Sequence, residues 1–119
     1  MNNKVHKLSI IGATGRMGQM LVRAAKERKD FQLVGLLEEN GHDLIGTKAS
    51  EFFPSLEKNL VISDSLDKIL EISDVVIDFT NPENSVKVAE EAAKYKVVDV
   101  IGTTGFSKSQ IKKIQNVSK

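Results

Sequence analysis

The sequence contains no cysteine among its 119 residues. This absence excludes disulfide bonds, thiolate metal ligands and a cysteine nucleophile within the chain, and it is typical of the reducing cytoplasm. The longest apolar runs reach about five residues, whereas a membrane-spanning helix needs about 20. The basic start is followed by only about four apolar residues, which is too few for a signal peptide. We therefore expect a cytoplasmic protein without a membrane partner.

The chain also lacks an excess of charge of one sign, since it has 17 basic and 16 acidic residues and a net charge of +1. This balance gives no reason to expect nucleic acid as a partner. The two histidines, His6 and His42, stand apart from other metal ligands in the sequence. We therefore interpret both as surface residues and predict no metal site. Neither a Tyr-x-x-x-Lys pair nor an HExxH motif is present.

The chain does have the composition of an ordinary soluble globular domain, with 40% hydrophobic and 28% charged residues. Its length is enough for one domain with a core, and no repeat, low-complexity tract or linker divides it. Short apolar segments alternate with helical patterns about five times. Strands are predicted at 8–11, 31–37, 60–63, 75–79 and 97–101, and helices at 16–29, 65–72, 82–94 and after residue 107. A long surface loop is predicted at 38–54.

Local signals define several of these elements. Asn81 before Pro82 predicts a helix N-cap, and Ser107 with Gln110 predicts a capping box. In the first helix the predicted core-facing stripe consists of Met17, Leu21, Ala24 and Ala25. Alternation of strands and helices predicts an α/β fold, an open doubly wound parallel sheet with helices on both faces. In such folds ligands bind at the carboxyl ends of the strands.

A glycine-rich segment, GATGRMG at residues 12–18, joins the first strand to the first helix. Glycines at such a junction allow a tight turn, close approach of a phosphate to the main chain, and close packing of the helix on its strand. The helix N-terminus offers unpaired N–H groups and a partial positive charge to an anion. The segment therefore predicts a pyrophosphate site, as in Rossmann-like dinucleotide-binding domains. A structural turn without a ligand is the alternative.

Two acidic residues, Glu38 and Glu39, follow the second strand. Glu38 has nearly the spacing from the glycine loop that a ribose-binding carboxylate has, although a solvated loop acid is the alternative. Together the two acids oppose a 2′-phosphate, by at most about 4 kcal/mol per charge at close range. Arg16 could offset this repulsion from the glycine loop, or it could be an exposed helix residue.

Two further strand ends carry candidate residues. Phe79 either lines a nicotinamide pocket or belongs to the core, and the side chain of Asn81 has a sufficient role as a helix cap. The GTTG turn at residues 102–105 provides several N–H and O–H donors that could recognise a carboxamide, or it is a simple turn. Asp78 lies within an apolar strand, and we interpret it as a structural acid whose hydrogen bonds are satisfied rather than as a catalyst.

Three segments, IIGATGRMG, VVIDFTNPENS and VIGTTGF, together resemble the amino-terminal half of the 4-hydroxy-tetrahydrodipicolinate (dihydrodipicolinate) reductase family. The resemblance covers nearly the whole chain. It implies reduction of 4-hydroxy-tetrahydrodipicolinate to tetrahydrodipicolinate, with loss of water, by NADH or NADPH in the diaminopimelate route to lysine. The cofactor-binding residues that it implies are Gly12, Ala13, Thr14, Gly15, Arg16 and Met17 at the pyrophosphate, Glu38 at the ribose, and Phe79, Thr80, Gly102, Thr103 and Thr104 toward the nicotinamide.

Two departures from the family matter. Glu39 occupies a place where some members carry a basic residue that pairs with a 2′-phosphate, so we predict a preference for NADH over NADPH. Members are about twice as long, and their second domain carries the catalytic histidine and lysine, the substrate-binding sheet and the homotetramer contacts. We therefore expect residues 1–119 to form a nucleotide-binding domain that is incomplete at its C-terminal end. By itself it should bind cofactor and turn nothing over.

Two other functions agree with part of the pattern. Glycine loops of this kind also occur in atypical short-chain reductases and in semialdehyde dehydrogenases, although the DFTNP and GTTGF segments argue against both. The second alternative is a non-catalytic module that senses NAD(P), which would agree with the absence of catalytic side chains from these residues.

Overall fold

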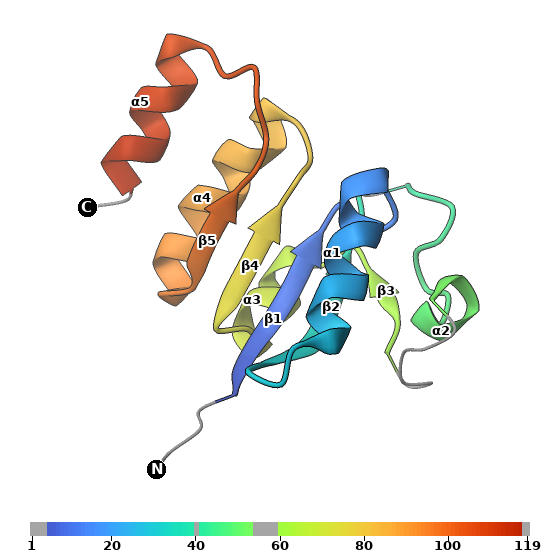
Figure 1. Ribbon diagram of the computed structural model, residues 1–119. Coiled ribbons are helices and arrows are strands. Elements are labelled where there is room, and N and C mark those ends of the chain that lie inside the picture. Colours follow the sequence, from blue (N-terminus) through green and yellow to red (C-terminus); the bar gives the residue numbers. More distant parts are fainter. Residues whose placement is uncertain (1–4, 40, 54–59, 118–119) are drawn as a thin grey trace.

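A computed structural model describes residues 5–39, 41–53 and 60–117 of the chain. Its five strands form one all-parallel sheet in the order β3-β2-β1-β4-β5 (Figure 1). The strands are β1 (His6–Ile11), β2 (Phe31–Leu37), β3 (Ile62–Ser63), β4 (Val75–Asp78) and β5 (Val98–Ile101). The helices are α1 (Arg16–Glu27), α2 (Ala49–Phe52), α3 (Leu66–Ile72), α4 (Pro82–Tyr95) and α5 (Lys108–Val117). The predicted doubly wound α/β fold is confirmed.

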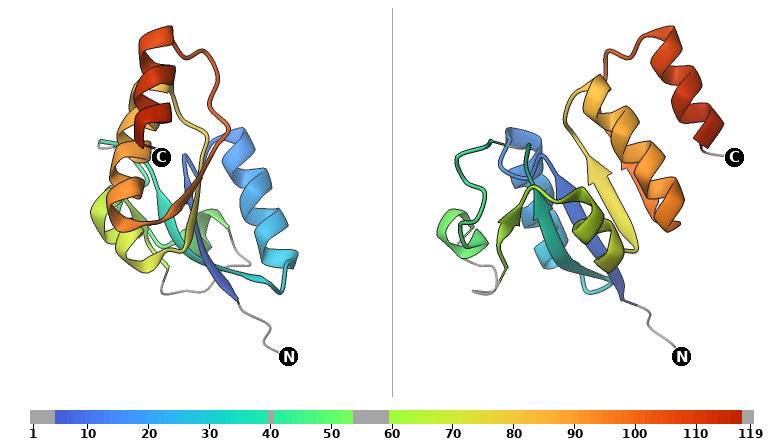
Figure 2. Two further views of the ribbon diagram at one scale, coloured as in Figure 1. Left: turned by 90° about the vertical axis from the view of Figure 1, so that its left-hand side faces the viewer. Right: turned by 180° about the vertical axis from the view of Figure 1, so that it is seen from behind.

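Helices cover both faces of the sheet (Figure 2). On one face, Ile10 of β1 packs in a core cluster with Val22 of α1. On the opposite face, Ile11 belongs to a second cluster with Leu70 of α3 and Val88 of α4. Because both faces are buried, the central strands carry nearly continuous apolar residues rather than an alternating pattern. The last helix, α5, packs against α4 beyond the edge strand β5 (Figure 1).

The direction in which the chain winds reverses between β1 and β4. From β1 it proceeds outward through β2 to β3, and it then returns to place β4 and β5 on the other side of β1. Ile11 is in register with Leu37 on one side and with Asp78 on the other, so the carboxyl ends of β1, β2 and β4 lie side by side. Ligands of open α/β sheets bind outside the carboxyl ends at such a reversal. The fold therefore places the candidate site beyond these three strand ends.

Both predicted helix starts are confirmed. The Asn84 N–H donates to Asn81 Oδ1 at 2.9 Å, and Pro82 is the first residue of α4. Ahead of α5, the Gln110 N–H donates to Ser107 Oγ at 3.2 Å, while the Ser107 N–H donates to Gln110 Oε1 at 2.8 Å. These reciprocal bonds satisfy N–H groups that the helix itself leaves unpaired.

The short helix α2 lies within residues 38–54, the segment predicted to be a loop. Pro54, the last residue of that segment, lies outside the described residues. Ala49 and Phe53 are buried in the core cluster on the α1 face. The Ala49 N–H also donates to the Leu60 C=O at 2.7 Å. A helix of four residues is too short to give a periodic pattern, so these tertiary contacts, rather than local sequence, explain it.

The core-facing stripe predicted for α1 is confirmed only in part, because Leu21 and Ala25 pack on the core cluster but its other two residues do not. The buried residues of α1 are Gly18, Val22 and Ala25. Met17 is 45% exposed and Ala24 is also exposed, so the predicted stripe is wrong at these two positions. The reason is the close contact at Gly18, where a Cβ atom would lie 2.2 Å from the Gly12 carbonyl oxygen. The first turn of α1 approaches β1 through this glycine rather than through the larger side chain of Met17.

We predict that Gly18→Ala lowers the free energy of unfolding, although alanine normally stabilises a helix interior by about 1 kcal/mol over glycine. The added Cβ would meet two backbone oxygens, Gly12 O at 2.2 Å and Ala13 O at 2.6 Å, so α1 would have to move away from β1. Urea-induced unfolding should show a loss of about 1–3 kcal/mol.

Gly15→Ala is the matched control, because its Cβ would meet only Gly12 O, at 3.5 Å. It should change the free energy of unfolding by less than about 1 kcal/mol. A Gly18→Ala chain as stable as the unmodified chain would contradict this account of the α1 contact.

Candidate functional site

A cavity of about 350 Å³ lies at the reversal of the sheet, outside the ends of β1, β2 and β4. It is lined by Gly12, Thr14, Gly15, Glu38, Glu39, His42, Phe79, Thr80 and Asn81. Six of these were predicted as cofactor-binding residues, namely Gly12, Thr14, Gly15, Glu38, Phe79 and Thr80. The fold thus brings together residues from three separate segments of the chain in one hollow.

The glycine loop turns sharply at Gly12, where φ is +84°. A side chain is excluded there for a second reason, because a Cβ atom would lie 2.6 Å from the Phe79 carbonyl oxygen. Gly12 N–H donates to the Leu37 C=O at 2.9 Å, which ties the loop to the end of β2. The strand end, the loop and the neighbouring strand are therefore held together through main-chain contacts.

The loop and the start of α1 leave a defined set of N–H groups for an anion. The Gly15 N–H donates to the Gly12 C=O at 3.2 Å, and the first bond of α1 is from the Gln19 N–H to the Gly15 C=O at 2.9 Å. The N–H groups of Arg16 and Met17 precede this first bond, so the helix does not use them. An anion placed at this end of α1 would meet these N–H groups and the positive end of the helix dipole. Both side chains are exposed.

Glu38 is held against the glycine loop by one of its two carboxylate oxygens. Oε2 accepts hydrogen bonds from the Thr14 N–H at 2.8 Å and from Thr14 Oγ1 at 2.5 Å. Within the described part of the chain Oε1 accepts no hydrogen bond, and Glu38 lines the cavity. A carboxylate anchored in this way can accept ribose hydroxyls with its second oxygen.

His42 belongs to the site, contrary to its interpretation as a surface residue. It is half-buried, lines the cavity, and places Nε2 3.3 Å from Thr14 Oγ1. His6 is also half-buried, but it lies at the opposite end of β1, where its ring is 5.8 Å from that of Phe31. Sequence spacing gave no signal for His42, because its position depends on how the loop after β2 folds back toward the glycine loop.

A second carboxylate stands beside Glu38. Glu39 Oε1 accepts a hydrogen bond from Asn81 Nδ2 at 2.9 Å, so Asn81 joins the loop after β2 in addition to capping α4. The cavity therefore has two acidic residues on one side. The Arg16 side chain does not line this cavity, and no salt bridge within the described residues joins it to either acid.

The loops after β4 and β5 are connected by hydroxyl groups. The Thr80 N–H donates to Thr103 Oγ1 at 3.0 Å, and Ser85 Oγ donates to the same oxygen at 2.7 Å. Gly102 lies under the Phe79 ring, since a Cβ at Gly102 would be 2.0 Å from Phe79 Cε1. This contact explains why the turn begins with glycine. Gly102, Thr103 and Thr104 do not line this cavity, although Gly102 and Thr103 contact its lining residues Phe79 and Thr80.

Asp78 is completely buried at the end of β4, and its hydrogen bonding is only partly satisfied. Thr80 Oγ1 donates to Oδ1 at 2.7 Å, while Oδ2 has no partner within the described residues. Burial raises the pKa of Asp78, and hydrogen bonds from Ser85 and Thr80 oppose this rise. Asp78 is buried as expected of a structural acid, but the prediction that its hydrogen bonds are satisfied is wrong for Oδ2 among the described residues.

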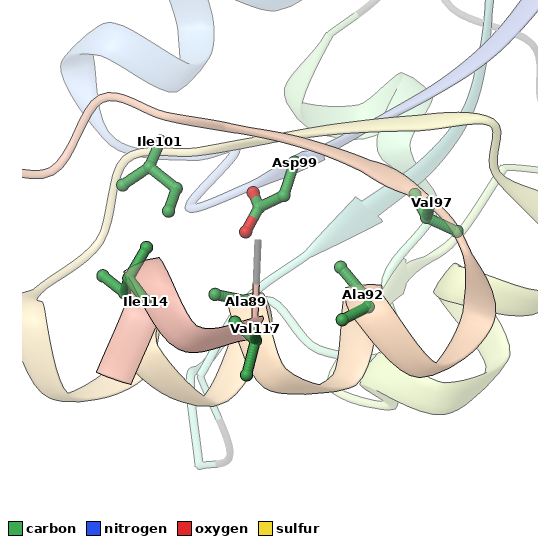
Figure 3. A pocket seen from close by; sticks show the side chains of 8 residues that line it. Ala89, Ala92, Val97, Asp99, Ile101, Ile114 and Val117 are labelled. Atoms are coloured by element: carbon green, nitrogen blue, oxygen red, sulfur yellow. The ribbon is translucent and has the colours of Figure 1, made fainter. Parts of the chain in front are cut away.

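Asp99 of β5 is half-buried as a residue, but both its carboxylate oxygens are buried, in a separate pocket of about 220 Å³ between β5, α4 and α5 (Figure 3). Its carboxylate points toward Ala89 of α4 and Val117 of α5. Neither carboxylate oxygen has a partner in the described part of the chain. Burial raises the pKa of Asp99 to about 7, and the charge of Asp78 contributes to the rise.

Among the described residues, no group of three or more His, Cys, Asp or Glu side chains could hold a metal ion. No helix within residues 5–39, 41–53 and 60–117 is both long enough and apolar enough to cross a membrane. Besides main-chain groups, the candidate site presents the hydroxyls of Thr14 and Thr80, two carboxylates, the His42 ring and the Asn81 amide.

Sequence comparison connects this site with a known family. The chain matches the family model described as dihydrodipicolinate reductase, N-terminus, over residues 6–119. It is 35% identical over 113 residues to the 4-hydroxy-tetrahydrodipicolinate reductase of Bartonella tribocorum, covering 95% of this chain and 42% of that protein. It is 42% identical over 100 residues to the protein of that name from Neisseria meningitidis serogroup C, covering 84% and 37%. The chain spans about two fifths of these relatives' length.

Solved structures are similar in fold. The dipicolinate-bound dihydrodipicolinate reductase from Paenisporosarcina sp. TG-14 gives a TM-score of 0.75 at 24% identity, covering 96% of this chain and 43% of that one. The NADP-bound aspartate semialdehyde dehydrogenase from Candida albicans gives a TM-score of 0.65 at 16% identity, covering 85% and 30%. At these identities the likeness shows a shared fold alone.

The buried carboxylate of Asp99 generates a prediction about stability and pH. Its pKa of about 7 in the folded chain exceeds the value of about 3.9 expected on unfolding, so the folded state holds its proton more tightly. Its contribution to stability is therefore fully present below about pH 4 and is lost as the pH rises to about 7. Asp99→Leu should raise the free energy of unfolding at pH 8 by about 1–3 kcal/mol, and by less at pH 5.

Denaturant unfolding at the two pH values provides the measurement. Asp43→Leu, at an exposed loop position, is the control and should change stability by less than about 0.5 kcal/mol at either pH. An Asp99→Leu chain that is less stable at pH 8, or equally stabilised at both pH values, would show that Asp99 does not carry an unpaired charge in the fold.

Proposed function

The chain belongs to the dihydrodipicolinate reductase family, and we propose from this that it forms the nucleotide-binding half of a 4-hydroxy-tetrahydrodipicolinate reductase. The reaction of the whole enzyme is the reduction of 4-hydroxy-tetrahydrodipicolinate to tetrahydrodipicolinate with loss of water, in the formation of diaminopimelate and lysine. The observation that carries the proposal is the family match over residues 6–119, which includes every residue of the cavity.

The residues at the cavity fit a dinucleotide. The N–H groups of Arg16 and Met17, which precede the first hydrogen bond of α1, suit a pyrophosphate, and Gly15 presents no side chain to crowd it. The free oxygen of Glu38 suits the hydroxyls of the adenosine ribose. Phe79 and Thr80, at the end of β4, lie on the side of the cavity where we place the nicotinamide. A bound reduced nicotinamide supplies the hydride.

The residues of this chain bind and orient, and we assign none of them to proton transfer. We place the substrate-binding groups, the catalytic histidine and lysine, and the homotetramer contacts in the part of the family's length that the chain does not span. Accordingly, we expect these residues by themselves to bind the nucleotide without turning over substrate.

The proposal predicts that calorimetric titration of this chain detects NADH binding that depends on Glu38. Glu38→Ala should weaken binding about 10- to 100-fold, because hydrogen bonds to a charged group contribute about 1.5–3 kcal/mol. Glu90→Ala, an exposed position on α4, should leave the affinity unchanged. Circular dichroism spectra should be recorded for each variant to check that it is folded. A folded chain that does not bind NADH, or a Glu38→Ala variant with unaltered affinity, would refute the proposal.

We further propose a preference for NADH over NADPH. Glu39 is held at the cavity by Asn81, and its charge adds to that of Glu38. Each charge would oppose a 2′-phosphate by at most about 4 kcal/mol at close range. Glu39→Arg should therefore raise the affinity for NADPH relative to NADH at least about tenfold.

Glu83→Arg makes the same change of charge on an exposed residue in the first turn of α4, and it controls for the overall charge of the chain. Glu83→Arg should change the ratio of NADPH affinity to NADH affinity much less than Glu39→Arg does. Unmodified protein that binds NADPH as tightly as NADH would contradict the proposed preference.

A further inference from the structure

The loop after β2 carries a histidine whose hydrogen-bond roles the structure defines. The Leu44 N–H donates to His42 Nδ1 at 3.1 Å, so Nδ1 is an acceptor and the neutral ring carries its proton on Nε2. Nε2 lies 3.3 Å from Thr14 Oγ1 and therefore donates to it. This tautomer follows from the hydrogen-bond network.

Thr14 connects the His42 ring to Glu38 through its hydroxyl group. Because its oxygen accepts from His42, the Thr14 hydroxyl proton is directed to Glu38 Oε2, at 2.5 Å. The Thr14 N–H binds the same oxygen at 2.8 Å. The His42 ring thus donates to the Thr14 hydroxyl, and the Thr14 hydroxyl donates to Oε2 of Glu38. The other oxygen, Oε1, is left for a ligand.

The His42 ring is itself fixed by its own turn. The His42 N–H donates to the Glu39 C=O at 3.0 Å, and the Ile45 N–H donates to the His42 C=O at 3.2 Å. The Thr47 N–H donates to the Leu44 C=O at 3.1 Å and extends this turn. Because the Leu44 N–H of this turn binds the ring, the ring keeps its orientation and can restrict the rotamer of Thr14, which it contacts. Pre-organising the groups that bind a ligand lowers the entropy lost on binding.

We propose that His42 is a positioning residue for nucleotide recognition, which acts through Thr14 to fix Glu38 for the adenosine ribose. The inference rests on the proposed function, because it assigns the ribose to Glu38. His42 lines the cavity, but the proposed effect runs through Thr14 rather than through a direct bond from the ring to the ribose. Its effect is therefore on discrimination between ribose forms rather than on affinity for the phosphates.

The test compares binding of ADP and 2′-deoxy-ADP to this chain by calorimetry. The unmodified chain should prefer ADP about tenfold, as expected when one hydrogen bond to a charged group is lost. His42→Ala should reduce that preference about threefold or more, mainly through weaker ADP binding. His42→Gln, whose amide retains a donor, should restore most of it. His6→Ala is the matched control at the opposite end of β1 and should leave the preference unchanged.

A double variant tests whether the effect passes through Thr14. Thr14→Val removes the hydroxyl, so adding His42→Ala to Thr14→Val should cause no further loss of preference. Independent losses from the two changes would overturn the proposal. So would a His42→Ala chain that keeps its preference, or one that loses affinity for both nucleotides equally, as a purely structural role would require. A chain that binds neither nucleotide without any substitution would overturn the proposed function itself.

Discussion

The close approach of α1 to the end of β1 is the constraint on which the candidate site depends. It exists because Gly18 has no side chain where a Cβ atom would lie 2.2 Å from the Gly12 oxygen. With α1 in this position, the N–H groups of Arg16 and Met17 at its start lie at the carboxyl edge of the sheet, next to the end of β2. The same proximity brings Thr14 within hydrogen-bond distance of Glu38. An α1 displaced from β1 would lose both features together.

The reversal of the sheet adds the second half of the site. Because β4 lies beside β1 in register, Phe79 and Thr80 emerge next to the glycine loop, and the Phe79 oxygen contacts the position of a Gly12 side chain. Two polar networks flank the cavity, one of Thr14, Glu38 and His42, the other of Thr80, Ser85 and Thr103. Each ties together loops that follow different strands. Neighbouring strand ends thus support one another around a shared ligand position.

The sequence predicted those features that depend on short-range chemistry. Strand runs, the Asn81 cap and the Ser107 capping box follow from local patterns, so the sheet and the helix starts were found. The packing of the first turn of α1, the helix α2 and the position of His42 depend on contacts between distant segments, and no local pattern reveals them. The glycine spacing indicated a phosphate site, but it did not show that the N–H groups of Gly12 and Ala13 are engaged by the Leu37 carbonyl of the next strand.

Amide chemical-shift mapping of this chain with NADH tests whether the α1 N-terminus and Glu38 form one nucleotide site. We predict the largest shifts at the amides of Thr14, Arg16, Met17 and Glu38, with little change around Asp99 in the pocket between β5, α4 and α5 (Figure 3). Shifts concentrated around Asp99 and Ile114, or none at the start of α1, would contradict it.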